Sequence, residues 1–194
     1  DNRDVGESDK LDAAGVPDLA ALLAGAEAGA IFPVPYQLAD MAQDVIGLMD
    51  ALAIDKAHIW GMSLGGMVAQ HLAFSHAARI GKIICVMSTS SDASLPSPPA
   101  SDLTPPNDDD EGALIDYMTE SLAEHGSPAF PTSLATRRAV ATKIIQRCWH
   151  PQGVIRQMAA ALADGSRTAR LKEIAVPFMV IHGEADTLID ISCG

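Results

Sequence analysis

The feature that most constrains this chain is a serine set among glycines, in the run GMSLGG at residues 61–66. A short apolar run at 57–60 precedes it, and apolar residues at helical spacing follow it from 63 to 74. Small residues are needed where a strand turns sharply into a helix, because a Cβ atom would clash there. The run therefore predicts a tight strand-to-helix turn with strained backbone angles at Ser63.

Such a turn would give the Ser63 hydroxyl the position of a nucleophile. It lifts the side chain clear of the sheet, and the backbone N–H of Leu64 at the helix start can stabilise an oxyanion at the same place. A glycine-rich helix start with an idle serine is the alternative interpretation. The order of strand, turn and helix favours the catalytic one.

Three short apolar runs predict buried parallel strands, at 57–60, 82–87 and 176–181. The helical pattern between the first two implies a right-handed crossover, so we expect an α/β protein. An Ala-rich helix is expected around 19–30, and a stronger one from 36 to 52. The apolar positions of the stronger helix repeat with a 3.6-residue period and predict its core-facing side: Leu38, Met41, Val45, Leu48, Met49 and Leu52.

Residues 88–170 differ in character and predict an insertion. Residues 88–110 are rich in Ser, Pro and Asp, which predicts a long loop, and the acidic residues at its end favour the start of a helix. Helical patterns then follow without a strand, at about 113–125, 133–148 and 152–163. We therefore expect a core formed by 1–87 and 171–194, with a linker and helical lid at 88–170.

The lid carries apolar side chains that indicate a hydrophobic acyl or alcohol group in a substrate. Packing of the lid on the core is the alternative, and we expect it to account for most of them. The residues are Leu114, Ile115, Met118, Leu122, Ile144, Ile145, Trp149, Met158 and Leu162.

The sequence resembles the α/β-hydrolase family, close to the esterase group that includes aclacinomycin methylesterase. The resemblance rests on DNRDVGES at 1–8, GMSLGG at 61–66 and HGEAD at 182–186. It implies a mostly parallel α/β-hydrolase sheet, incomplete here, with helices on both faces and an inserted helical lid. It also makes Ser63 the nucleophile and Asp186 the acid that orients a catalytic histidine. A turn aspartate at a strand end is the alternative for Asp186.

The chain departs from this family at its two ends. In the family the catalytic histidine follows the acid, whereas none of the eight residues after Asp186 is a histidine. The early strands, which bring the second oxyanion donor, are also missing, so we expect a hydrolase truncated at both ends. Of the other histidines, His125 and His150 in the lid are the candidates to replace the base, and His182 is expected to be structural.

The function implied is hydrolysis of a small-molecule carboxylic ester through a Ser-His-Asp acyl-enzyme mechanism. The alternatives are a non-catalytic binding protein of the same fold, a cofactor-free perhydrolase, a C–C bond hydrolase and a phosphopantetheine thioesterase. No cofactor or metal is implied, because Ser63 supplies the nucleophile. A sheet that lacks its early strands exposes an edge and a face, so we expect a homo-oligomer or an aggregation-prone chain.

Charge and cysteine content narrow the partners and the compartment. The formal net charge of -12 argues against nucleic acid and anionic membrane surfaces, which repel a chain this acidic. No apolar stretch approaches the ~20 residues of a membrane-spanning helix. Three scattered cysteines do not form a disulfide framework. We therefore expect a cytoplasmic protein that binds neither nucleic acid nor membrane.

Overall fold

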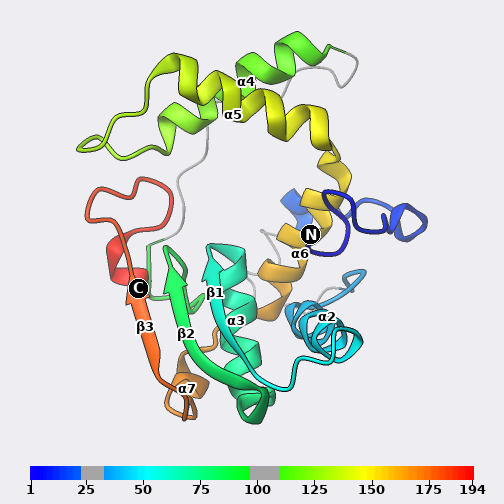
Figure 1. The fold of residues 1–194 in the computed structure, drawn as a ribbon, viewed down its shortest axis with the longest axis vertical. Coiled ribbons are helices and arrows are strands. Elements are labelled where there is room, and N and C mark those ends of the chain that lie inside the picture. The colour runs from blue at the N-terminus through cyan, green and yellow to red at the C-terminus, as the bar shows by residue number, and fades with distance from the viewer. Residues whose placement is uncertain (23–32, 97–109) are drawn as a thin grey trace.

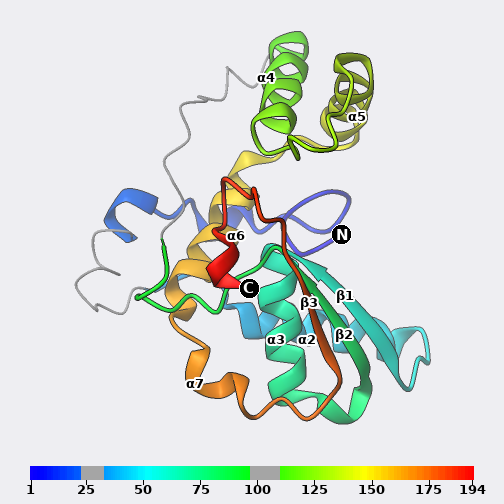
Figure 2. The ribbon, with the colours of Figure 1, turned by 90° about the vertical axis from the view of Figure 1, so that its left-hand side faces the viewer.

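The computed structural model describes residues 1–22, 33–96 and 110–194, and Figures 1 and 2 show their arrangement. Residues 19–22 are helical, where the Ala-rich helix was expected to begin, and the rest of that predicted helix lies outside the described residues. The helices are α2 (Leu38–Ala51), α3 (Leu64–Ser75), α4 (Glu111–Glu124), α5 (Leu134–Arg147), α6 (Pro151–Asp164) and α7 (Thr168–Leu171). The strands are β1 (Ala57–Met62), β2 (Ile80–Val86) and β3 (Phe178–Ile181). Short 3-10 turns are η1 (Asp12–Ala14), η2 (Ala77–Arg79) and η3 (Ile191–Cys193).

The three strands form a parallel sheet in the order β1-β2-β3. Its register aligns Trp60 with Ile84 and Met179 across the sheet. All three apolar runs of the sequence are strands, and α3 connects β1 to β2. The expected α/β fold is therefore confirmed, with an incomplete parallel sheet.

The main core lies between the sheet and the helices α2 and α3. It contains fully buried side chains such as Leu38, Leu72 and Ile83. The predicted core-facing side of α2 is only partly right, because Leu48 and Leu52 are each 61% exposed. Their places on that side are taken by Ala42 and Ile46, both buried, so the inward face of α2 is centred further round the helix.

The opposite face of the sheet carries apolar side chains in contact with solvent. Trp60 is 62% exposed, Met62 47% and Met179 57%. Helices α2 and α3 pack on the other side of the sheet, and Figure 2 shows α4 and α5 beyond its upper end. The expectations of helices on both faces and of a buried strand at 57–60 are thus not met in this part of the chain. Side chains alternate along a strand, so one face of β1 is buried while the other remains open.

The lid helices separate into two groups. The pair α4 and α5 stands away from the sheet in Figure 1 and has a small core of its own, built on Leu114, Ile115, Ala141 and Ile145. Helix α6 instead contributes Ala160 to the main core. Asp110 caps α4 by accepting from the N–H of Ala113, as the acidic residues before that helix predicted. The division of the chain into a core and a lid over 88–170 stays a prediction.

Candidate active site

Ser63 lies at the turn between β1 and α3, where the sequence placed it. Its backbone has φ 52° and ψ -120°, a left-handed conformation that is costly for a residue with a side chain. Two hydrogen bonds hold the turn. The N–H of Ser63 donates to the carbonyl of Val86, the last residue of β2, at 2.9 Å. The hydroxyl of Ser88, which follows β2, donates to the carbonyl of Ser63 at 2.8 Å. The strained turn predicted from the sequence is present.

Glycines around Ser63 make this turn possible by close packing. A Cβ at Gly61 would overlap the backbone carbonyl of Gly65, and one at Gly66 would lie 2.8 Å from the sulfur of Cys85. A Cβ at Gly65 would meet nothing within 4 Å. The packing requirement therefore falls on Gly61 and Gly66.

Leu64 is the first residue of α3 and directly follows Ser63. The first N–H groups of a helix have no acceptor within the helix and lie at the positive end of its dipole. The N–H of Leu64 is thus placed beside Ser63 as a hydrogen-bond donor for a negative oxygen.

Asp186 lies in the loop that follows β3, so it shares the carboxyl edge of the parallel sheet with Ser63. Its Oδ1 accepts hydrogen bonds from the N–H groups of Leu188 and Ile189, both at 2.9 Å. Its Oδ2 lies 3.5 Å from Nε2 of His182, and that nitrogen is 2.8 Å from the carbonyl of Ile189. These contacts fix the carboxylate in one orientation.

One cavity of about 440 Å³ brings these residues together. Ser63 and Asp186 both line it, and His125 comes to it from the loop after α4. The rest of the wall comes from 126–130 in the lid, from 183–185, 188 and 189 after β3, and from Met62 and Met87. Within the residues that the structure describes, no side chain hydrogen-bonds the hydroxyl of Ser63.

Packing accounts for most of the nine apolar lid residues, as expected, although they pack between lid helices rather than on the core. None of the nine lines the cavity. Leu114, Ile115 and Ile145 are buried between α4 and α5, and Met118, Leu122 and Trp149 pack against them. The loop 125–130 lines the cavity instead, with Phe130 82% exposed. The only feature of the sequence that marked this loop was the Gly126-Ser-Pro break between two predicted helices.

The two lid histidines differ in position. His125 lines the cavity, whereas His150 lies at the start of α6 beside the N-terminal loop, with Nε2 3.1 Å from Asp12. His182 is almost buried next to Asp186, as expected for a structural residue. His125 is thus the histidine of this chain that shares the cavity with Ser63.

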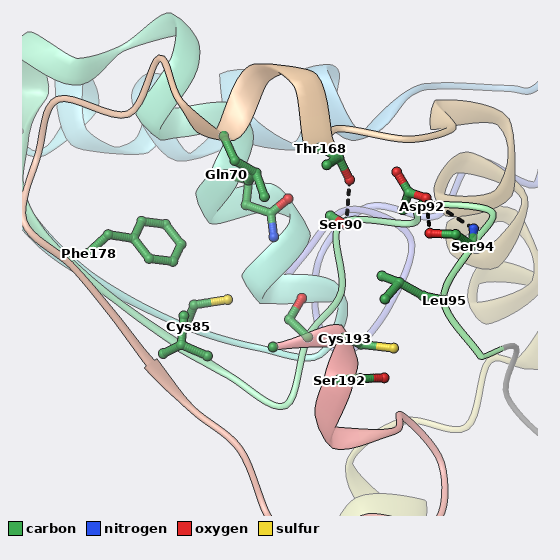
Figure 3. A pocket seen from close by; sticks show the side chains of 14 residues that line it. Gln70, Cys85, Ser90, Asp92, Ser94, Leu95, Thr168, Phe178, Ser192 and Cys193 are labelled. Carbon is green, nitrogen blue, oxygen red and sulfur yellow. Dashed lines mark hydrogen bonds between the residues drawn. The ribbon is translucent and has the colours of Figure 1, made fainter.

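A second cavity, of about 340 Å³, lies on the helix side of β2 and β3 (Figure 3). Its polar groups bond to one another: Thr168 donates to the hydroxyl of Ser90 at 2.9 Å, and Ser94 donates to Asp92 at 2.7 Å. Burial raises the pKa of the Cys85 thiol, which therefore stays protonated at neutral pH.

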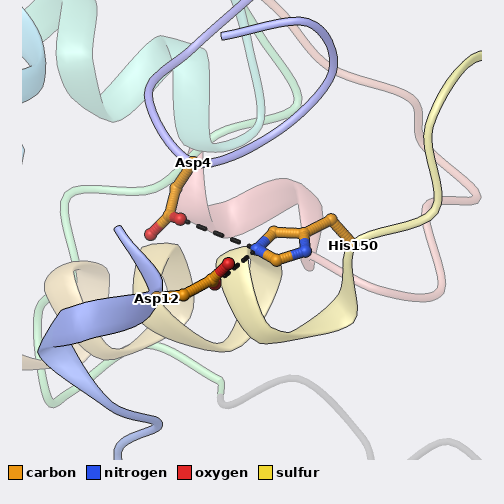
Figure 4. A group of neighbouring side chains, drawn as sticks. All are labelled: Asp4, Asp12 and His150. Carbon is orange, nitrogen blue, oxygen red and sulfur yellow. Dashed lines mark ion pairs between the residues drawn. The ribbon is translucent and has the colours of Figure 1, made fainter. Parts of the chain in front are cut away.

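A group of Asp4, Asp12 and His150 has ligand atoms within 4.8 Å of one another (Figure 4). The guanidinium of Arg156 lies among them: Nε donates to Asp4 at 2.5 Å, and Nη2 donates to Asp4 at 2.7 Å and Asp12 at 2.8 Å. Asp4 and Arg156 are 0% and 1% exposed. This group is an ion-pair cluster with its own cation, and it ties the N-terminal loop to α6.

Three comparisons place this architecture among known proteins. The profile of the alpha/beta hydrolase fold matches residues 1–192. The chain is 44% identical over 62 residues to a Caulobacter segnis protein that carries the name carbamate hydrolase RutD, covering 32% of this chain and 23% of that one. It is 25% identical over 171 residues to 3-oxoadipate enol-lactonase 2 of Acinetobacter baylyi, covering 82% and 58%. A hydrolase structure from Pseudomonas aeruginosa superposes with a TM-score of 0.54 at 25% identity, covering 84% and 60%. The chain spans less than two thirds of the length of each relative.

In the part of the chain that the structure describes, no helix is both long enough and apolar enough to cross a membrane.

The tight packing at the turn predicts the effect of adding one methyl group. Gly61→Ala is expected to lower the free energy of unfolding by roughly 1–3 kcal/mol, because the new Cβ overlaps backbone. Gly65→Ala is the matched control, since its Cβ has open space, and it should change stability by less than about 1 kcal/mol. Urea unfolding followed by circular dichroism measures both. Equal effects of the two substitutions would contradict this account of the turn.

The buried pair of Asp4 and Arg156 predicts a large effect of neutralising the carboxylate. Asp4→Asn is expected to lower the free energy of unfolding at pH 7 by roughly 3–5 kcal/mol, because it leaves a buried guanidinium without its main partner. Asp116→Asn is the control, since Asp116 pairs with Arg138 on the surface and should cost at most about 1 kcal/mol.

The same pair predicts a pH dependence. Hydrogen bonds from Arg156 lower the pKa of Asp4 from 3.8 to about 2. The folded pKa is below the unfolded one, so this stabilisation is present above pH ~4 and is lost as the pH falls toward ~2. The stability gap between the native protein and Asp4→Asn should therefore narrow over that range. A gap that stays constant would contradict the assignment.

Proposed function

The chain belongs to the alpha/beta hydrolase fold family, and from that premise we propose that it supplies the nucleophile and acid of a serine hydrolase that cleaves small carboxylic esters. The observation that carries the proposal is the single cavity that Ser63, Asp186 and His125 line together. Relatives named as a carbamate hydrolase and an enol-lactonase support attack on an acyl carbonyl as the general reaction.

In the proposed reaction the Ser63 hydroxyl loses its proton to an imidazole and its oxygen bonds to the ester carbonyl carbon. The carbonyl oxygen becomes negative and accepts a hydrogen bond from the N–H of Leu64, the first residue of α3. Collapse of this intermediate releases the alcohol, which takes the proton back from the imidazole. Water then repeats the sequence on the acyl-serine and regenerates Ser63.

Asp186 is proposed to orient and stabilise the imidazolium. Two backbone N–H groups hold its Oδ1, and its Oδ2 lies 3.5 Å from Nε2 of His182. His125 is the imidazole that this part of the chain brings to the cavity, and we propose it as the base available here. Perhydrolysis, thioester cleavage and C–C hydrolysis begin with the same serine chemistry and differ in the acceptor or the bond cleaved.

A non-catalytic binding protein is the second candidate, favoured by one observation. The Ser63 hydroxyl has no hydrogen-bond partner among the described residues, so no base is engaged with it. We also propose that the protein is cytoplasmic. We propose further that copies of it associate through the exposed sheet face that contains Trp60 and Met179.

Esterase activity is expected to depend on Ser63. p-Nitrophenyl butyrate should be hydrolysed by this chain below the ~1–10³ s⁻¹ typical of enzymes, because no base contacts the hydroxyl. Ser63→Ala should reduce even this rate to that of buffer. Ser75→Ala, at the exposed end of α3, is the control and should retain the rate of the unmodified chain. Equal rates for Ser63→Ala and the unmodified chain would favour the binding protein.

The role of His125 has a separate test. If His125 is the base, His125→Ala should lower kcat by about 10²-fold or more, because general-base catalysis typically contributes about 10²–10⁴-fold. His150→Ala is the matched control, because that imidazole lies in the Asp4 cluster and not in the cavity. A rate unchanged by His125→Ala excludes it as the base.

A further inference from the structure

The carboxylates on the wall of the active-site cavity face no Lys or Arg on that wall. Glu184 and Asp186 line it, and no Lys or Arg does. Glu184 is exposed, and within the described residues it forms no hydrogen bond or ion pair. His125 is the one basic group of the lining, and its Nε2 lies 3.9 Å from the carboxylate of Glu124. Even a protonated His125 would therefore leave two carboxylates on the wall against one cation.

The basic residues of the chain lie elsewhere. The sequence has 13 Lys and Arg, and none falls in 23–32 or 97–109, the segments that the structure leaves undescribed. Many of these basic residues form ion pairs with acids: Arg3 with Asp44, Arg79 with Asp50, Arg138 with Asp116, Arg147 with Asp1, Arg156 with Asp4 and Arg167 with Asp164. No cation of this chain is therefore placed to receive a carboxylate inside the cavity.

The remainder of the wall is mostly apolar. Met62 and Met87 come from the strand ends, Pro128 and Phe130 from the lid loop, and Leu188 from the loop after β3. An apolar wall does not compensate a buried charge, and two nearby carboxylates repel a third across a short distance. A ligand anion would lose hydration and meet repulsion in the same place.

We propose that this cavity selects substrates whose bound acyl part is uncharged or cationic, and that Glu184 is the residue that rejects acyl groups ending in a carboxylate. The proposal rests on the function proposed above for the same cavity.

Binding of three matched amides tests the proposal without requiring turnover. p-Nitrobutyranilide, its succinyl analogue and its 4-aminobutyryl analogue share a four-carbon acyl chain that ends neutral, negative and positive. Isothermal titration calorimetry of the 194-residue chain is expected to give a dissociation constant at least about tenfold higher for the succinyl compound than for the neutral one. The 4-aminobutyryl compound is expected to bind at least as tightly as the neutral one.

Substitution assigns the effect to one residue. Glu184→Gln should narrow the ratio of succinyl to neutral dissociation constants by at least about threefold. Glu120→Gln, an exposed glutamate on α4 outside the cavity wall, should leave that ratio unchanged. Equal shifts in both variants would mean that net charge acts at long range and would overturn the role of Glu184.

The outcomes also separate this proposal from the proposed function. Succinyl binding as tight as neutral binding, or no binding of the neutral and cationic compounds, overturns the selectivity. If the selectivity holds while Ser63→Ala hydrolyses p-nitrophenyl butyrate as fast as the unmodified chain, the proposed reaction fails and the cavity remains a charge-selective binding site.

Discussion

The backbone of Ser63 is held in a left-handed conformation, and the rest of the candidate site depends on that constraint. A residue with a side chain loses about 1–3 kcal/mol in such a conformation unless its surroundings enforce it. Here the enforcement is local and specific. The carbonyl of Val86 at the end of β2 accepts a hydrogen bond from the N–H of Ser63, and the hydroxyl of Ser88 donates one to the carbonyl of Ser63. The strain is thus offset by contacts that also connect the first two strands of the sheet.

The segment that carries Ser88 is fixed in turn by a buried arginine. Arg167 donates from Nη2 to the carbonyl of Thr89 at 2.9 Å and from Nε to Gln70 on α3 at 2.8 Å. Burial would raise the pKa of Asp164, but its hydrogen bonds with His71 and Arg167 outweigh burial and lower it. The charge on Asp164 therefore persists and keeps Arg167 in place. The turn at Ser63 is connected by this route to the far end of α6.

Much of this architecture followed from local sequence patterns, and the misses have identifiable physical causes. The strands, helices and turn were predictable because periodicity and glycine spacing report on short-range geometry. The burial of Asp4 was not, since its partner Arg156 is 152 residues away in the sequence. An open face of the sheet was expected, but the apolar run at 57–60 did not show that Trp60 would lie on it, because such a run does not say whether both faces of its strand are covered. Packing of the lid helices was expected, but not their partner: the apolar residues of α4 and α5 pack against each other, and an amphipathic pattern does not identify what it packs on.

In the proposed reaction, chemistry and selection are carried by different parts of this chain. The proposed nucleophile Ser63 and the N–H of Leu64 belong to a turn whose glycines and strained backbone leave little freedom for change. The cavity wall comes mostly from the loop 125–130 and the loop after β3. Loops of this kind tolerate substitution better than a packed turn does. Relatives with this fold carry names as different as carbamate hydrolase and enol-lactonase. These names fit the proposal, because loops can change the bound group while the fold stays the same.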